Sequence, residues 1–335
     1  MKINRVKFLK QLKSVSAGLA ALEVLEQQST CFVFQDGKVK TFNDEVACVS
    51  DSLLSMEGAI QSKFLLALLN KLTEEEIDIE LDESKNELVV KGKRRWAELK
   101  MEQSILLPVD SVEKPKEWQP LNEDFVDAVS VVSHCASKDN SKFVLTCIQI
   151  EPDCIIACDD SQVCRYSVKT GITKSILIRQ EALKRIVGLD MVELAETENW
   201  IHFRNKRGLS LSCRLYMDEY LDVSDIFKEE PTEEISFPED LEDVVKKAEI
   251  FSSGEGCICV ELKNNKMRVT GQGESGKYVE QKKVLYDGKS LKFQIDSKLL
   301  LEIINRKSVC RVAKDRLFVV SDKWKYVAST VLKDN

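Results

Sequence analysis

The sequence predicts an α+β protein built from three tandem domains, and a recurring segment is the first observation behind this prediction. Residues 62–70 and 297–305 share one pattern, a serine, a lysine, an apolar ridge and a final asparagine, and residues 179–188 form a looser third copy. These segments start at 62, 179 and 297, which gives steps of 117 and 118 residues. A period this long indicates similar domains, because the repeats of solenoid proteins are much shorter.

What surrounds each copy recurs as well. We expect a first helix to open near Asn4, Asn122 and Pro238, about 58 residues before the second helix of each pair. Such helices bury an apolar stripe against a sheet, so each domain should carry two helices packed on antiparallel sheets. The expected domains are 1–112, 118–228 and 235–335, joined by the polar, proline-containing stretches 110–119 and 228–236. The strand-like runs after the copies are Ile77–Leu81 with Leu88–Met101, Val192–Ala195 with Trp200–Leu215, and Val309–Val312 with Leu317–Leu332.

The first predicted helix, residues 4–19, is amphipathic. Its apolar residues recur at helical spacing, and Lys7, Lys10 and Lys13 fall on the opposite side. Strands should follow at 30–35, 38–42 and 47–50, with Asp36-Gly37 forming a hairpin turn. The apolar side comprises Val6, Phe8, Leu9, Leu12, Val15 and Leu19.

The first helices of the other two domains have the same pattern. In the second domain we expect Phe125, Val129 and Val132 to be buried. In the third, Pro238 suits a first helical turn, and a buried stripe at i, i+3, i+4 and i+7 follows. That stripe comprises Leu241, Val244, Val245 and Ala248, opposite Glu242, Asp243, Lys246 and Lys247.

Composition limits the function. The 335 residues carry a net charge of −7, and 43% hydrophobic content describes a globular protein with real cores. No apolar run approaches the roughly 20 residues that span a bilayer, and we expect neither a signal peptide nor a membrane partner, so the expected location is the cytoplasm. The eleven cysteines are then expected to be reduced thiols, with Cys154, Cys158 and Cys164 as small buried side chains rather than metal ligands.

Motifs for catalysis are missing. The chain has no phosphate-binding GxxxxGK[ST], no GxGxxG, no GxSxG and no HExxH. Its two histidines, His134 and His202, lie far from each other in sequence. The sequence therefore predicts a protein that is not an enzyme and needs no cofactor or metal.

Three local matches, together with the domain pattern, support a resemblance. They are Met1-Lys2-Ile3 with the helix Phe8–Ser16, the central Cys158–Val163, and the final Tyr326–Ser329. With its three two-helix domains, the whole chain resembles the bacterial-type beta sliding clamp, the beta subunit of DNA polymerase III and its processivity factor. The family usually has Thr-Asp-Gly-His-Arg-Leu at the central match, whereas this chain keeps the Asp and has Val163 for Leu. The resemblance therefore implies a divergent member, of phage or mobile-element type.

The resemblance implies a function and sites. Two chains would join head to tail into a ring whose helices face double-stranded DNA without reading its sequence, and DNA polymerase and a clamp loader would be the partners. The joint would involve Trp96, Ile250 and Phe251. A cleft between the second and third domains would receive a partner peptide on Leu145, Val163, Pro231, Val327 and Ser329. The DNA-facing residues would be Lys7, Lys10, Lys13, Lys63, Lys138, Lys142, Phe143, Lys184, Arg185, Lys246, Lys247 and Lys298.

Other interpretations stay open. Lysines on a helix back are often merely solvated, and Leu145, Val163 and Val327 also fit ordinary strand core. One alternative function is an interaction platform with the clamp fold that is not loaded on DNA. Another is an unrecognised hydrolase that uses the runs of Asp and Glu.

Overall fold

The structure is a computed structural model that describes residues 1–23, 26–229, 231, 233–252, 256–286, 288–307, 309–313 and 315–332. The chain divides into two compact units. Unit 1 comprises Met1–Ser130, Cys147–Asp153 and Lys169–Asp218, and unit 2 comprises Val131–Thr146, Cys154–Val168 and Glu219–Asn335. The predicted domain ranges stay a prediction. In the described part of the chain, no helix is long and apolar enough to cross a membrane.

Unit 1 contains a large antiparallel sheet in the order β1-β6-β7-β8-β5-β2-β3-β4-β16-β15-β14-β9. The step from β4 to β16 pairs Val49 with Ser210 and so joins strands from distant parts of the sequence. The hairpin between β2 and β3 turns at Asp36 and Gly37, both with positive φ, as the sequence predicts. The strands are β1 (Lys2–Asn4), β2 (Cys31–Gln35), β3 (Lys38–Phe42), β4 (Val46–Asp51), β5 (Gly58–Gln61), β6 (Glu76–Asp82), β7 (Glu87–Lys91), β8 (Trp96–Glu102), β9 (Gln119–Pro120), β14 (Met191–Glu196), β15 (Trp200–Asn205) and β16 (Ser210–Arg214). Unit 1 also contains β10 (Cys147–Ile150), which pairs antiparallel with β13 (Ile176–Arg179).

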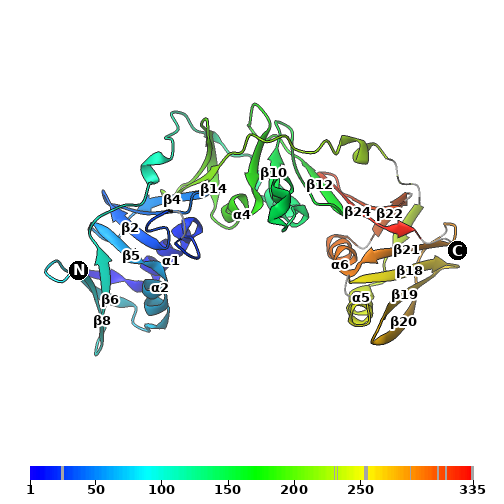
Figure 1. The fold of residues 1–335 in the computed structure, drawn as a ribbon, viewed down its shortest axis with the longest axis horizontal. Helices are drawn as coiled ribbons and strands as arrows, with labels where there is room; N and C mark the ends of the chain where they lie inside the picture. Colours follow the sequence, from blue (N-terminus) through cyan, green and yellow to red (C-terminus); the bar gives the residue numbers. More distant parts are fainter. Residues whose placement is uncertain are drawn as a thin grey trace. The chain divides into compact units, whose positions relative to one another are not determined.

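Helices α1 (Arg5–Val15) and α2 (Ser62–Lys71) lie side by side on this sheet (Figure 1). The Asn4 side chain caps α1 by accepting a hydrogen bond from the Lys7 amide at 2.9 Å. Phe8, Leu12 and Val15 are fully buried against the strands, which confirms the predicted stripe at these positions. Val6 was predicted on the same side and is exposed, because the stripe facing the sheet is narrower than the one the spacing suggests.

Arg5 connects the two helices. Its Nε donates to the Glu74 carbonyl at 2.6 Å, and its Nη1 donates to the Leu69 carbonyl at 2.9 Å. Leu69 lies in the last turn of α2, where carbonyls lack helical partners and a positive charge is favourable. This basic residue of the N-terminal segment thus holds the helix pair together.

The second helix pair is shorter than the others. Helix α3 (Phe125–Val132) begins three residues after the expected Asn122, with Phe125, Val129 and Val132 buried as predicted. Helix α4 (Gln180–Leu183) begins at the expected Gln180 but continues as a 3-10 helix over Lys184–Ile186. Gly188 follows with a φ of +82°, a conformation in which glycine ends helices without strain.

Unit 2 contains two sets of antiparallel strands. One runs β11-β12-β24-β23-β22-β17 and the other β20-β19-β18-β21-β25. Residues 233–236 were expected in a linker, but they pair with β22 as strand β17 because their backbone completes that sheet edge. The strands are β11 (Cys154–Cys158), β12 (Gln162–Ser167), β17 (Glu233–Ser236), β18 (Cys257–Lys263), β19 (Lys266–Gly273), β20 (Gly276–Lys283), β21 (Leu291–Asp296), β22 (Val309–Ala313), β23 (Arg316–Val320), β24 (Trp324–Ser329) and β25 (Val331–Leu332).

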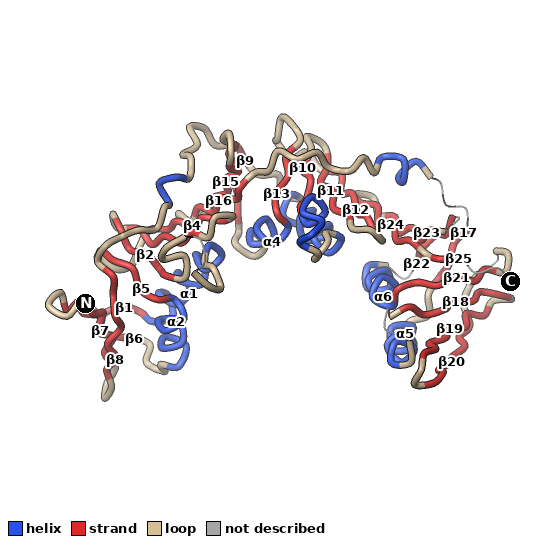
Figure 2. Tube along the Cα trace, viewed as in Figure 1, coloured by secondary structure: helices blue, strands red, loops and turns tan. Residues whose placement is uncertain are grey.

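Helices α5 (Leu241–Ile250) and α6 (Ser297–Arg306) lie together on one face of β18, β19 and β21 (Figure 2). The predicted stripe of α5 is buried, although the helix begins at Leu241 and Pro238 lies before it. The sheet approaches α5 closely at Gly271, where a Cβ would lie 1.8 Å from the Ala248 carbonyl oxygen. Only glycine allows this contact. The close packing of α5 on the sheet therefore depends on the missing side chain of Gly271.

Candidate nucleic-acid interface and partner cleft

The outward face of α1 is basic and unopposed. Lys7, Lys10 and Lys13 are all exposed, and the first turn of the helix has no acidic residue. None of the three has an ion-pair partner among the residues that the structure describes. Lys63, in the first turn of α2, is exposed in the same way. A phosphate backbone could approach these four ammonium groups without first breaking an ion pair.

The candidate residues around the second helix pair are less uniform. Lys184 and Arg185 are exposed on the 3-10 helix after α4, and Lys138 is exposed beyond α3. Lys142 forms an ion pair with Asp160, and this hydrogen-bonded contact raises the pKa of the lysine. Phe143 beside it is half-buried, so it offers less surface to a ligand than its neighbours.

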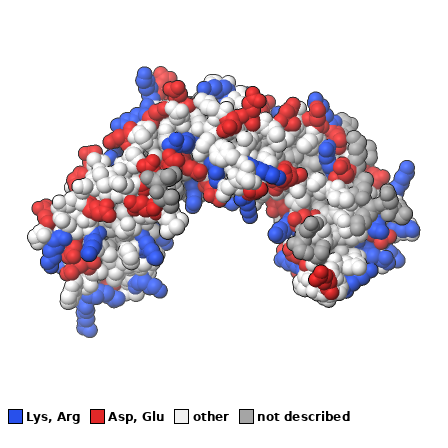
Figure 3. Space-filling model, in the orientation of Figure 1, with Lys and Arg blue, Asp and Glu red and all other residues white. Residues whose placement is uncertain are grey.

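The outward face of α5 differs from that of α1. Lys246 pairs with Glu242 at 2.6 Å, one helical turn away, and Lys247 lies 3.6 Å from Glu280 on β20. Hydrogen bonds from Lys282 and Tyr278 lower the pKa of Glu280 to about 2, so it stays ionised at neutral pH. On α6, Lys298 is exposed. Figure 3 shows acidic and basic side chains interspersed over the face it draws, without one dense basic patch.

The three residues expected at a joint between chains have different environments. Trp96 is 71% exposed at the start of β8, and Ile250 is 74% exposed at the end of α5. Phe251 is half-buried, with its ring stacked on that of Tyr278 at 6.0 Å between centroids. Two strand edges lie near these residues. Strand β8, which begins at Trp96, pairs with β5 through Met101 and Glu102 at its far end. Strand β20, which carries Tyr278, is the edge strand of its sheet. Their role in assembly stays a prediction.

The structure brings three of the five residues of the expected partner cleft together. Val163 and Val327 are cross-strand partners on β12 and β24, each 3% exposed, and Leu145 belongs to the same buried cluster. Pro231 is half-buried. Ser329 is exposed and instead lines a polar hollow of about 690 Å³ on the sheet of β18–β21, beside the half-exposed Cys257 and Cys259. Whether these residues receive a peptide stays a prediction.

Sequence reasoning missed the segment that packs on this cluster. Tyr220, Val223, Ile226 and Phe227 lie against it, and Cys158 and Phe318 extend it. The available signal was the spacing of these four apolar residues within an acidic stretch, 217–230, that otherwise has the composition of a linker. The cluster on which they pack could not be inferred from the sequence. It combines residues from strands more than 150 positions apart, such as Val163 on β12 and Val327 on β24.

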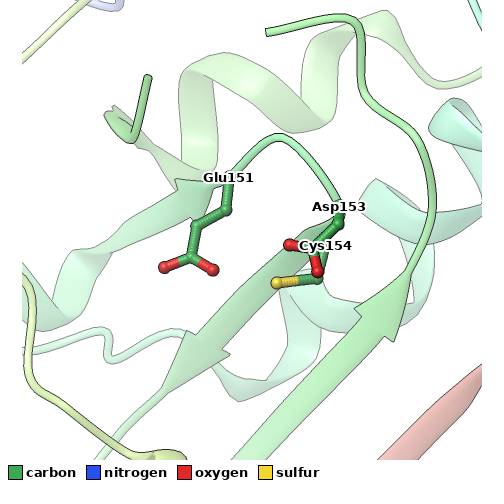
Figure 4. Close-up of side chains that lie close together, drawn as sticks. All are labelled: Glu151, Asp153 and Cys154. Carbon is green, nitrogen blue, oxygen red and sulfur yellow. The ribbon is translucent and has the colours of Figure 1, made fainter. Parts of the chain in front are cut away.

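Side chains that could in principle bind a metal include the cysteines and a group of three residues at one turn. Nine of the eleven cysteines are buried, including Cys154, Cys158 and Cys164, and the other two, Cys257 and Cys259, are half-buried. Within the described residues, one set of three possible metal ligands has ligand atoms within 4.8 Å of one another. It comprises Glu151, Asp153 and Cys154, around a single turn of the chain (Figure 4). A turn with two acidic side chains is common without an ion, so we assign no metal to it.

Whole-chain comparison identifies the fold. No family model and no curated protein matches this sequence. Solved structures do match: the sliding clamp of Pseudomonas aeruginosa bound to griselimycin has a TM-score of 0.84 and 14% identity, over 99% of this chain and 98% of that one. The chain has the sliding-clamp fold. The DNA polymerase III beta chain of Streptococcus pneumoniae matches with a TM-score of 0.84 and 15% identity, and the beta subunit of Thermotoga maritima with a TM-score of 0.83 and 13% identity. Each of these matches covers 99% of this chain and 99% of the other.

This match confirms the predicted α+β class with three tandem clamp domains, each carrying two helices on antiparallel sheets. At 13–15% identity, clamp structure is preserved while most side chains differ. The fold therefore fixes where helices and strands lie, and the side chains described above determine what this clamp-fold protein can bind.

Proposed function

We propose that this chain is a non-enzymatic sliding clamp that encircles duplex DNA as a head-to-tail homodimer and tethers a DNA polymerase. The observation that supports it most strongly is the clamp fold over the whole chain, at a TM-score of 0.84. The unopposed lysines of α1 suit the task, because a tether must hold phosphates weakly and without reading bases in order to slide. Such a clamp would act in the cytoplasm and need a clamp loader to open it.

DNA retention tests the proposal. The protein is loaded with its host's clamp loader onto nicked circular duplex and separated from free protein by gel filtration. The circle is then cut once with a restriction nuclease. We expect the protein to remain with the circle and to be lost after cutting, because only a topological link depends on closed DNA. Equal retention before and after cutting would contradict encirclement.

Assembly into a ring has its own test. We propose that the edge of β8 in one chain meets the edge formed by α5 and β20 in the other, which gives two equivalent contacts and closes the ring. Replacing Ile250 and Phe251 with Arg should then yield monomers in sedimentation. Leu285→Arg is the matched control, since Leu285 is 78% exposed in unit 2 and lies outside the proposed joint. If the protein with Arg at both Ile250 and Phe251 is still a dimer, these two residues do not belong to the joint between chains.

A second candidate, an interaction platform that is never loaded on DNA, has one observation in its favour. Lys142, Lys246 and Lys247 are each paired with a carboxylate, so part of the expected DNA-facing charge is neutralised. The retention experiment separates the two candidates, because a platform would not stay with the circle.

A further inference from the structure

Four side chains form a continuous apolar row across unit 2. Cys158 on β11 is the cross-strand partner of Val163, Val163 of Val327, and Val327 of Phe318. Directly opposed residues in antiparallel strands point to the same face, so the four side chains line up across β11, β12, β24 and β23. Here this set is called the apolar row; Leu145 adjoins it in the same cluster.

One segment of the chain, Tyr220–Glu229, lies on the apolar row, and we call it the strap. Val223, Ile226 and Phe227 pack against the cluster and remain half-buried. At one end the Cys158 amide donates to the Tyr220 hydroxyl at 2.9 Å, and the Cys158 thiol lies 3.3 Å from the same oxygen. At the other end Glu229 forms an ion pair with Arg316 at 3.1 Å.

The strap is built like a bound peptide. Its regular structure is a 3-10 helix, Ser224–Lys228, stabilised from within: the Ile226 amide donates to the Val223 carbonyl at 3.1 Å, and the Ser224 amide to the Asp222 carboxylate at 2.9 Å. Between these anchors, five side chains of the strap are exposed: Leu221, Asp222, Ser224, Asp225 and Lys228. Side-chain anchors rather than strand pairing thus attach it to the row, and anchors of this kind can be exchanged for those of another peptide.

We propose that the strap is the resident occupant of the apolar row and that a partner peptide must displace it to dock there. The inference rests on the proposed function only for the source of that peptide. An occupant tethered to its own site acts at a high effective concentration, so the row is open in only a fraction of molecules. The apparent Kd of a competitor rises by the inverse of that fraction, about 100-fold if one molecule in 100 is open. Partner binding is thereby conditional on release of the strap.

The strap sequence itself is the probe. A fluorescein-labelled peptide copying residues 219–229 is titrated against the whole protein and followed by fluorescence anisotropy. We expect Ile226→Ser with Phe227→Ser to bind this peptide at least about tenfold more tightly than the unchanged chain, because its own strap has lost two anchors. Leu221→Ser is the matched control, since it removes an exposed apolar side chain from the same segment and should change nothing. A peptide with Ser at both anchor positions should bind neither protein.

Amide hydrogen exchange on the unchanged chain provides an independent test should the double variant not fold. Excess strap peptide should accelerate exchange of the Ile226 amide, while exchange along β24 stays the same. The proposal is overturned if a folded double variant gains no affinity, or if the peptide leaves the exchange of Ile226 unaltered. Neither measurement uses DNA or polymerase, so failure of DNA retention and failure of the strap proposal can be told apart.

Discussion

Helices α1 and α5 occupy the same place in their repeats and pack in the same way, but their outward faces differ in charge. Both bury an apolar stripe on strands, with Phe8, Leu12 and Val15 in one and Val244, Val245 and Ala248 in the other. The lysines of α1 have no described acidic partner, whereas those of α5 are matched by Glu242 and Glu280.

The difference shows that packing and DNA affinity are specified by separate residues on one helix. A buried stripe constrains only the side facing the sheet, and the opposite side is free to vary in charge. If the proposed function holds, the two helices should contribute unequally to DNA binding.

Neutralising α1 should have the largest effect. Lys7→Gln, Lys10→Gln and Lys13→Gln together should weaken duplex binding about 30-fold at low salt and lower the slope of log Kd against log salt by up to about 2.7, since each phosphate contact contributes about 0.9. Anisotropy titrations of a labelled 30-base-pair duplex at several salt concentrations measure both. A slope equal to that of the unchanged chain would mean that α1 does not contact DNA. Lys38→Gln, on β3, serves as the control for loss of a lysine elsewhere.

Releasing the lysines of α5 should give a smaller change of opposite sign. With Glu242→Gln and Glu280→Gln, Lys246 and Lys247 lose their acidic partners, and we expect about a fivefold gain in duplex affinity with a steeper salt slope. The same titration measures it. Unchanged affinity would indicate that α5 points away from the duplex, and the comparison with α1 would then concern geometry rather than charge.

Removing the α5 lysines should matter less still. Lys246→Gln with Lys247→Gln should weaken duplex binding by only about twofold, because each ammonium group is already neutralised by a carboxylate. A loss as large as that of the α1 variant would break the comparison between the two helices. Thermal melting checks that both variants remain folded.

The smallest effect concerns pH. The pKa of Glu280, about 2, lies below the ordinary value of 4.5. In the folded protein the carboxylate therefore stays ionised at pH 4.5 and above, and its ion pairs are lost only as the pH falls towards 2. The ratio of duplex affinities between Glu280→Gln and the unchanged chain should therefore be equal at pH 5.5 and pH 8. A ratio that approaches one at pH 5.5 would show that Glu280 is protonated there and that Lys247 is released by mild acid.

The sequence by itself determined the local elements of this protein. The repeated segments located the starts of α2, α4 and α6, and the spacing of Leu241, Val244, Val245 and Ala248 gave the buried face of α5. These features follow from backbone periodicity and from which side of a helix is apolar, both of which neighbouring residues encode.

Only the tertiary structure decided which distant residues meet. It placed Glu280 beside Lys247, laid the strap over Val163 and Val327, made residues 233–236 a strand, and set Ser329 on the polar hollow apart from the buried cluster. The physical reason is that cross-strand neighbours are set by sheet register, and that register pairs segments with no periodic relation in sequence.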